Sequence, residues 1–260
     1  MGQFSRIEWT DSTWNPVTGC TAVSPGCDHC YALTLAQRRL RSLYLRQPPV
    51  RNDERAIADP FSIRLWPERL ADPVKWRPGR MIFVNSMSDL FHVDIPEDYV
   101  RQLFGVMLRA DWHVFQVLTK RPARAVRFVR RNSDLFRGGM VPEHIWMGTS
   151  IESQAQVHRV SALRAVRAKI RFLSCEPLLG PLRLSLNGIA WVIAGGESGR
   201  GFRPLDPEWV RSVRDQCVES GVRFFFKQVG GYTPKAGGRL LDEVEWNELP
   251  GVAYEQLASP

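Results

Sequence analysis

The sequence Cys20-Thr21-Ala22-Val23-Ser24-Pro25-Gly26-Cys27-Asp28-His29-Cys30-Tyr31 contains three of the chain's five cysteines within eleven residues, spaced C-x6-C-x2-C. Thiols this close together in a chain with few cysteines share a metal, a cluster or a disulfide. The two remaining cysteines stand alone. Cys217 lies on a predicted helix and is expected in the core, whereas Cys175 follows a predicted strand and has no assigned role.

The composition of the 260-residue chain, 44% hydrophobic and 24% charged, is that of an ordinary globular protein. No apolar run approaches the roughly 18 residues that are needed to cross a bilayer. Residues 1–6 lack the apolar core of a signal peptide, so we expect a cytoplasmic protein with no membrane partner. Because the cytosol is reducing, a disulfide is the weakest interpretation of the three cysteines, and a metal or cluster is favoured.

The net charge of +8 permits a polyanionic partner such as a nucleotide or a nucleic acid. Phosphate groups are bound by clustered lysines and arginines. The arginines are spread over predicted helices, for example within 38–41, 124–131 and 159–167, so a solvated helix surface explains them equally well.

Short apolar strands alternate with amphipathic helices from residue 80 onwards. The predicted strands are 80–85, 113–118, 145–149, 170–174, 189–194 and 222–227, and the predicted helices are 96–110, 122–131, 153–167 and 206–219. A first strand within 7–19 and a helix over 30–45 precede them. Strands that alternate with helices form βαβ units. The pattern therefore predicts an α/β fold, a full or partial (β/α) TIM-like barrel with six to eight mainly parallel strands.

We expect residues 1–260 to form a single barrel domain with one insertion. The insertion, at about 46–79, contains six prolines and is predicted to include a short strand near 61–65. Connections of that length tend to be lids or binding segments. The tail from about residue 231 shows no periodic pattern and is predicted to be irregular.

Polar residues follow the predicted strands, at the end where the active sites of such barrels lie. They are Asn85, Ser86, Asp89, Thr119, Lys120, Glu152, Glu176, Glu197 and Lys227. Each one alone is explained as a helix cap or a turn residue. As a set, the charged residues predict a single polar rim, where they need one another, a ligand or a metal to offset their desolvation. The cysteine loop follows the first predicted strand and belongs to the same rim.

Two kinds of metal centre fit the three cysteines, Cys20, Cys27 and Cys30. Structural zinc takes four ligands, and the fourth would be His92 or His29, of which His29 is the poorer because it lies between two of the cysteines. A [4Fe–4S] cluster takes thiolate ligands. Three thiolates on its four irons leave one iron open to another molecule, which is a physical reason for three cysteines at the mouth of a barrel.

Seven blocks of the chain resemble a phage-associated protein family of unknown function, phage proteins thirty-seven/sixty-eight. The blocks are WNPVTGC (14–20), SPGCDHCYA (24–32), FVNSMSDLFH (83–92), LTKRP (118–122), FLSCEPLLG (172–180), GGESG (195–199) and FFKQ (225–228). That family is in turn similar to the radical S-adenosylmethionine superfamily, whose usual loop is C-x3-C-x2-C with an aromatic residue before the last cysteine. Here the first gap is six residues, and His29 replaces the aromatic residue.

The resemblance implies a radical S-adenosylmethionine-type iron–sulfur enzyme that depends on an electron donor and acts on a nucleotide or nucleic acid. Cys20, Cys27 and Cys30 would ligate the cluster; Asn85, Ser86, Asp89, Thr119, Lys120 and Glu152 would line the S-adenosylmethionine site; Glu176, Glu197 and Lys227 would be catalytic. The protein would orient the cofactor and keep water and oxygen away from it.

Two other functions fit the same residues. The first is a non-catalytic nucleic-acid-binding protein in which the three cysteines hold a structural zinc. The second is a metal-dependent hydrolase or nuclease that uses Glu152, Glu176 and Glu197 around Mg²⁺ or Mn²⁺, with the cysteines serving only the structure.

Overall fold

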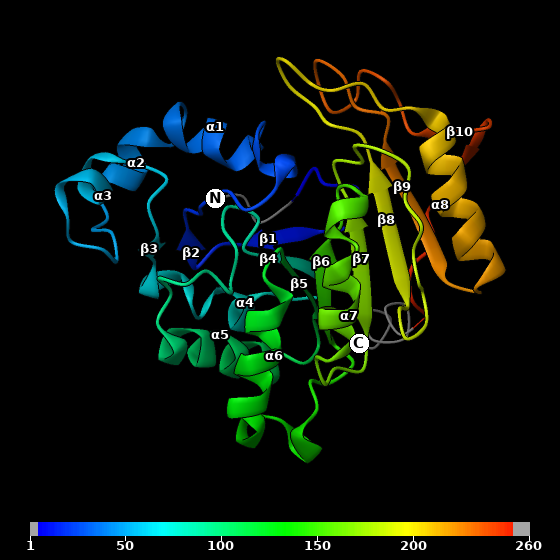
Figure 1. The fold of residues 1–260 in the computed structure, drawn as a ribbon. Helices are drawn as coiled ribbons and strands as arrows, with labels where there is room; N and C mark the ends of the chain where they lie inside the picture. Colours follow the sequence, from blue (N-terminus) through cyan, green and yellow to red (C-terminus); the bar gives the residue numbers. More distant parts are fainter. Residues whose placement is uncertain (1–4, 252–260) are drawn as a thin grey trace.

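A curled sheet of seven parallel strands forms the centre of the computed structural model, which describes residues 5–251 (Figure 1). In spatial order the strands are β1 (Ser12–Trp14), β4 (Met81–Val84), β5 (Val114–Thr119), β6 (Ile145–Ser150), β7 (Arg171–Cys175), β8 (Trp191–Gly195) and β9 (Arg223–Gln228). All six neighbouring pairs are parallel. Within the described residues the end strands β1 and β9 do not pair with each other. The predicted α/β fold is confirmed, as a partial barrel and not a closed one.

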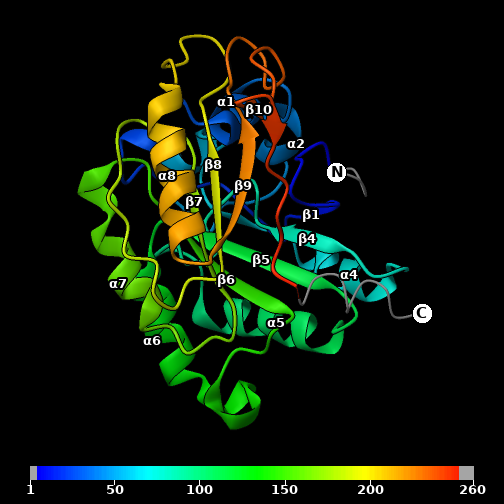
Figure 2. The same ribbon diagram turned by 90° about the vertical axis from the view of Figure 1, so that its right-hand side faces the viewer.

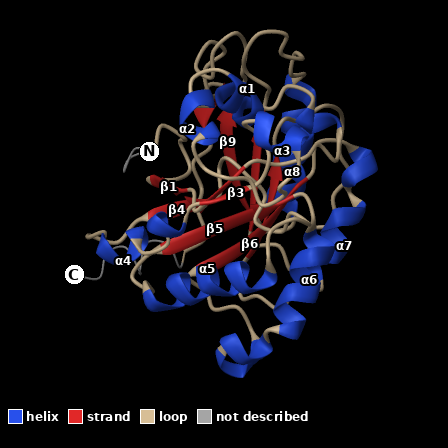
Figure 3. Ribbon diagram, turned by 90° about the vertical axis from the view of Figure 1, so that its left-hand side faces the viewer, coloured by secondary structure: helices blue, strands red, loops and turns tan. Residues whose placement is uncertain are grey.

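Four helices cover the convex face of this half-barrel (Figures 2 and 3). They are α5 (Glu97–Arg109), α6 (Pro122–Arg131), α7 (His158–Arg164) and α8 (Pro207–Glu219). In α5 the buried residues Val100, Leu103, Phe104 and Met107 recur at the spacing of one helix face, and they pack on alternate residues of the strands. None of the helices in residues 5–251 is both long enough and apolar enough to span a membrane.

The concave face carries the other alternate strand residues, and at its amino end these are aromatic. We call Trp9, Phe83, Trp146, Phe172, Trp191 and Phe225 the aromatic floor. Trp191 lies at its centre, with ring centroids 5.6 Å from those of both Trp146 and Phe172. At Gly148 a Cβ atom would lie 2.3 Å from the Phe172 ring, so this position has to be glycine for the floor to close. The floor fills the lower half of the concave face.

The first predicted strand, over 7–19, is two strands in the structure. Only β1 joins the parallel sheet, whereas β2 (Val17–Thr18) pairs antiparallel with β3 (Arg64–Leu65) of the insertion. Pro16 lies between β1 and β2 and has no N–H to continue the ladder.

The single helix predicted over 30–45 is also divided, into α1 (Tyr31–Gln37) and α2 (Arg41–Leu45). The break allows Tyr44 to turn inward, where its ring lies 5.8 Å from that of Trp66. Burial of Tyr44 against the insertion therefore overrides the continuous helical periodicity.

The Pro-rich insertion is folded around one buried arginine. It contains α3 (Glu54–Ala58), β3 and α4 (Asp72–Lys75). Arg64 has no exposed surface, and its guanidinium donates hydrogen bonds to the backbone carbonyls of Gln47, Ala56, Ile57, Asp59 and Ser62. An arginine can satisfy several carbonyls at once because its five N–H groups lie in a fixed fan.

The tail after residue 231 is more regular than predicted. It forms an antiparallel hairpin, β10 (Leu240–Leu241) with β11 (Val244–Glu245), and then runs along the free edge of β9. The backbone N–H of Phe226 donates to the carbonyl of Trp246, and that of Glu248 donates to the carbonyl of Phe224. An edge strand carries unpaired backbone groups that need partners, which accounts for this ordering.

Short 3-10 turns complete the structure. They are η1 (Pro25–Cys27), η2 (Pro67–Arg69), η3 (Ser133–Leu135), η4 (Arg137–Gly139) and η5 (Gln154–Gln156). The turn η1 lies inside the cysteine loop, where Pro25 and Gly26 fold the long gap between Cys20 and Cys27.

Candidate functional site

The cysteine loop lies over the carboxyl ends of the parallel strands. Its first residues are fixed by a hydrogen bond from the Gly19 N–H to the Met87 carbonyl, just beyond β4. Gly19 has φ +92°, and a Cβ atom there would lie 2.2 Å from the Ser62 carbonyl oxygen, so only glycine allows this approach to the insertion. The thiols of Cys20, Cys27 and Cys30 are free and partly exposed.

Two cations from the end of β5 contact two of the three sulfurs. Lys120 Nζ lies 3.5 Å from Cys27 Sγ, and Arg121 Nη1 lies 3.6 Å from Cys20 Sγ. Positive charge at this distance favours thiolates, and it also offsets the charge of an anionic group that the thiolates hold.

Asp89 fixes both of these cations. Its carboxylate accepts hydrogen bonds from the Thr119 hydroxyl at 2.7 Å, from the Lys120 N–H at 3.0 Å and from Arg121 Nη1 at 2.8 Å. Asp89 and Thr119 are therefore positioning residues that orient the cations beside the sulfurs.

The thiols of Cys20 and Cys27 differ in acidity. Burial, together with the nearby charge of Asp89, raises the pKa of Cys20 to about 11, against the opposing effect of Arg121. Partial burial would also raise the pKa of Cys27, but the Lys120 ammonium and hydrogen bonds to the backbone of residues 23 and 24 outweigh it. The net pKa of Cys27 is therefore lowered.

Glu152 lies under the loop and is completely buried. Ser24 Oγ donates to Glu152 Oε1 at 2.8 Å, Arg159 Nη1 lies 2.9 Å from Oε2, and Lys120 Nζ forms a third contact. A Cβ atom at Gly26 would lie 2.4 Å from Glu152 Cγ, so the loop backbone rests directly on this side chain. Both carboxylate oxygens have partners, and Glu152 anchors the loop to the sheet.

Glu197, which follows β8, ties down the opposite end of the loop. Glu197 Oε2 lies 2.8 Å from His29 Nδ1 and accepts hydrogen bonds from the Arg203 N–H and Nε at 2.9 and 3.0 Å. Arg203 also donates to the Pro25 carbonyl at 3.0 Å. Burial alone would raise the pKa of Glu197, but the hydrogen bonds from Arg203 and His29 lower it to about 2.

Glu176 and Lys227 form the third ion pair of the rim. Glu176 Oε1 lies 2.9 Å from Lys227 Nζ, and Ser174 Oγ donates to the other carboxylate oxygen at 3.2 Å. Both side chains keep part of their surface in solvent, 14% and 22% respectively. Glu176 is the most exposed of the three rim glutamates.

Asn85 is the polar residue of the rim that the protein leaves unsatisfied. It is 2% exposed, and neither its amide nitrogen nor its amide oxygen has a hydrogen-bond partner among residues 5–251. It directly follows the end of β4 and has φ +58°, the left-handed conformation of a turn. The neighbouring Ser86 is engaged, because its hydroxyl bonds to the Asn15 amide. Buried amides without partners are rare and indicate a place for a ligand or water.

The two histidines that could complete a zinc site are both engaged elsewhere. His29 Nδ1 is held by Glu197, as described above. His92 Nε2 bonds to Thr21 Oγ1 at 2.8 Å, and His92 Nδ1 accepts from the Asp94 N–H at 3.2 Å. Zinc would need thiolates and a fourth ligand about 2.3 Å from one ion. No three His, Cys, Asp or Glu side chains in the described part of the chain surround such a position, and this includes Cys20, Cys27 and Cys30. In this arrangement the three thiols do not converge on one metal position, so zinc or a cluster would require the loop to draw them together.

The three rim glutamates are separated from one another by their own cations. Glu152 pairs with Lys120 and Arg159, Glu176 with Lys227, and Glu197 with Arg203 and His29. A two- or three-carboxylate Mg²⁺ site would need at least two of them to share one position. The expected polar rim exists, but its charges are compensated within the chain.

Three arginines of this site were not among the predicted site residues. Arg121 carried a sequence signal, since it directly follows Thr119 and Lys120 in the LTKRP block. Arg159 and Arg203 lie on α7 and in the loop before α8, and nothing in the local sequence distinguishes them from solvated surface arginines.

These contacts define a class: a parallel α/β half-barrel with a three-cysteine loop held over the carboxyl ends of its strands. The chain belongs to the family described as "Protein of unknown function (DUF5131)", whose model matches residues 4–250. Comparisons with curated proteins and with solved structures found no match. The family match covers the cysteine loop and all seven strands of the sheet.

Proposed function

We propose that the protein is a cytoplasmic radical S-adenosylmethionine-type iron–sulfur enzyme in which Cys20, Cys27 and Cys30 hold a [4Fe–4S] cluster. The observation that supports this most is the loop itself: it presents three free thiols at the rim, and two of them are in contact with cations. A cluster with three thiolates is anionic, and Lys120 and Arg121 offset that charge.

The residues around the loop suit the cofactor in distinct ways. When bound, the cluster supplies the electron that cleaves the sulfonium of S-adenosylmethionine, with an external electron donor reducing it. The buried amide of Asn85 offers one free donor and one free acceptor, which match a carboxylate and an ammonium of that cofactor. Ser86, Asp89, Thr119 and Glu152 act on the site by holding its loop and cations in place.

The substrate side of the proposed site is the pair formed by Glu176 and Lys227. The two side chains keep 14% and 22% of their surface in solvent, although Glu176 Oε1 itself is buried against Lys227. Carboxylates and amines are the groups that act as general acids and bases in enzymes. Below them, the aromatic floor closes the concave face and excludes water from the side opposite the opening.

Anaerobic reconstitution with iron and sulfide tests the proposal. We expect uptake of about four iron atoms per chain, and release of 5′-deoxyadenosine when S-adenosylmethionine and a reductant are added. The triple variant Cys20→Ala/Cys27→Ala/Cys30→Ala should take up no iron and remain folded, because the sheet does not depend on the loop thiols. The control Cys217→Ala removes a thiol from the core and should keep full uptake. One zinc per chain with no iron uptake would contradict the proposal.

A further inference from the structure

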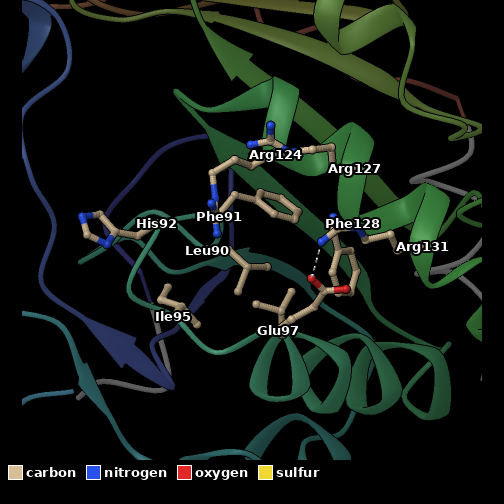
Figure 4. A pocket seen from close by; sticks show the side chains of 10 residues that line it. Leu90, Phe91, His92, Ile95, Glu97, Arg124, Arg127, Phe128 and Arg131 are labelled. Carbon is tan, nitrogen blue, oxygen red and sulfur yellow. Dashed lines mark ion pairs between the residues drawn. The ribbon is translucent and has the colours of Figure 1, made fainter. Parts of the chain in front are cut away.

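A small cavity with a cationic lining lies between α5, α6 and the loop after β4, on the convex side of the sheet (Figure 4). Its volume is about 60 Å³. Three arginines of α6 line it, Arg124, Arg127 and Arg131, and the acid in its lining is Glu97 at the start of α5. A water needs about 10–15 Å³ of such space, so the cavity is large enough for several waters or for one small tetrahedral anion.

Positively charged side chains outnumber negatively charged ones in the lining of this cavity. Arg131 pairs with Glu97 at 3.5 Å, which uses the acid of the lining. Arg124 and Arg127 have no ion pair and no side-chain acceptor within residues 5–251, and Arg124 Nε is buried without a hydrogen-bond partner. Buried N–H groups are nearly always satisfied, so an unpartnered guanidinium N–H at a cavity wall indicates an acceptor that is not part of the chain.

The walls of the cavity make it a pocket for a single oxyanion. Phe91 and Phe128, with ring centroids 5.9 Å apart, contribute apolar surface. A low-dielectric wall strengthens the attraction between a guanidinium and an anion. Guanidinium groups bind phosphate oxygens in a bidentate manner, and the two free arginines lie one helical turn apart on the same helix.

The cavity is directly connected to the cysteine loop. His92, part of its lining, bonds to Thr21, which follows Cys20 in the chain. Arg121, at the start of α6, contacts Cys20 Sγ, and Arg124 lies one turn further along the same helix. An anion held here would therefore be separated from the cysteine loop by the side chain of His92.

We infer that Arg124 and Arg127 bind a phosphate group, and that this phosphate belongs to a nucleotide or a nucleic-acid strand whose base or sugar reaches the rim. The inference deepens the proposed function and rests on it for the role of the bound molecule as substrate. The phosphate contact itself depends only on the two arginines and their cavity.

The test is a titration of the protein, with and without reconstituted cluster, with three probes: inorganic phosphate, a nucleoside 5′-monophosphate and a short single-stranded oligonucleotide. In the variant Arg124→Gln/Arg127→Gln we expect binding of each phosphate-bearing probe to weaken about tenfold or more, as loss of charge-assisted contacts requires. The slope of log affinity against log salt for the oligonucleotide should decrease by about 0.7 if one phosphate contact is lost. Tighter binding of the oligonucleotide than of the monophosphate would identify a strand as the source, and equal binding a nucleotide.

The control is Arg130→Gln, which removes one charge from the same helix outside the cavity lining and is matched to the single variant Arg127→Gln. It should change each affinity less than about twofold. The inference is overturned if this control weakens binding as much as the double variant does, or if the double variant binds all three probes like the wild type. Thermal unfolding of each variant checks the fold, and Arg127→Gln alone, at an exposed position, serves if the double variant is destabilised. Iron uptake is measured separately, so a failure of the proposed function is distinguished from a failure of this inference.

Discussion

The two halves of the concave face are stabilised in opposite ways. The aromatic floor consists of tilted and edge-on rings, whereas the rim above it consists of ion pairs that tie the cysteine loop to the sheet. Packing is non-directional and tolerates exchange of one apolar side chain for another. Paired charges are directional and fail when one partner is removed. The difference shows that the floor supports the fold and the rim positions the loop.

The largest expected effect is at the floor. Trp191→Ala removes the ring at the centre of four aromatic neighbours and leaves the Glu248 carbonyl without its donor. We expect a loss of about 3–5 kcal/mol in the free energy of unfolding, measured by urea denaturation. Trp191→Phe keeps most of the ring contacts and should cost clearly less. Equal losses in the two variants would mean that the floor contributes through the indole hydrogen bond and not through packing.

A somewhat smaller loss is expected at the rim. Glu152→Gln leaves Lys120 and Arg159 without their carboxylate, and breaking a buried pair costs about 3 kcal/mol. Because Glu152 also supports the loop backbone, the Cys27 thiol should react faster with an alkylating reagent than in the wild type. The control Glu68→Gln breaks an exposed pair with Arg69 and should cost less than about 1 kcal/mol. An unchanged alkylation rate in Glu152→Gln would show that the loop holds its position without this anchor.

The smallest effect is a pH dependence to which the rim contributes through Glu197 and the aromatic floor does not contribute. The pKa of Glu197 is lowered from its ordinary 4.5 to about 2, so the folded state favours the charged carboxylate. The stability that this group contributes is complete above about pH 4.5 and is lost as the pH falls towards 2. Urea denaturation at a series of pH values should show a smaller loss in Glu197→Gln than in the wild type, whereas Trp191→Phe should retain the full loss. Asp242 and Asp134, whose pKa values are also lowered by arginine partners, contribute to the loss in every variant. A parallel pH profile in Glu197→Gln would assign the acid sensitivity to another group.

The fold could be predicted because each strand, and the helix that follows it, has a hydrophobic periodicity that can be recognised within its own residues. The buried runs at 81–84, 114–119 and 191–195 are short and apolar, and the helix faces recur at three and four residues. The strand-end rule also predicted that the residues after these runs share one rim. The sequence left undecided whether the barrel is full or partial, because closure depends on how far the seven twisted strands curl and on the tail that covers β9.

The partners within the rim could not be predicted. Register alone points Glu152 and Glu176 to the concave face, but the curl of the sheet decides which cations reach them. The contact of Glu197 with His29 joins residues 168 apart in sequence, and no local pattern indicates it. The separation of the carboxylates into three ion pairs is therefore a property of the tertiary structure, and it weakens the hydrolase interpretation that the sequence left open.

The pairing of residues 246–248 with the outer edge of β9 has a consequence for the order in which the sheet forms during synthesis. The outer backbone groups of this strand find partners only in residues 246–248, more than a dozen positions after β9 ends. Until those residues have been synthesised, the growing polypeptide exposes an edge strand whose unpaired backbone N–H and C=O groups can pair with another chain. The outer edge of the sheet is therefore complete only after residues 246–248 have been synthesised.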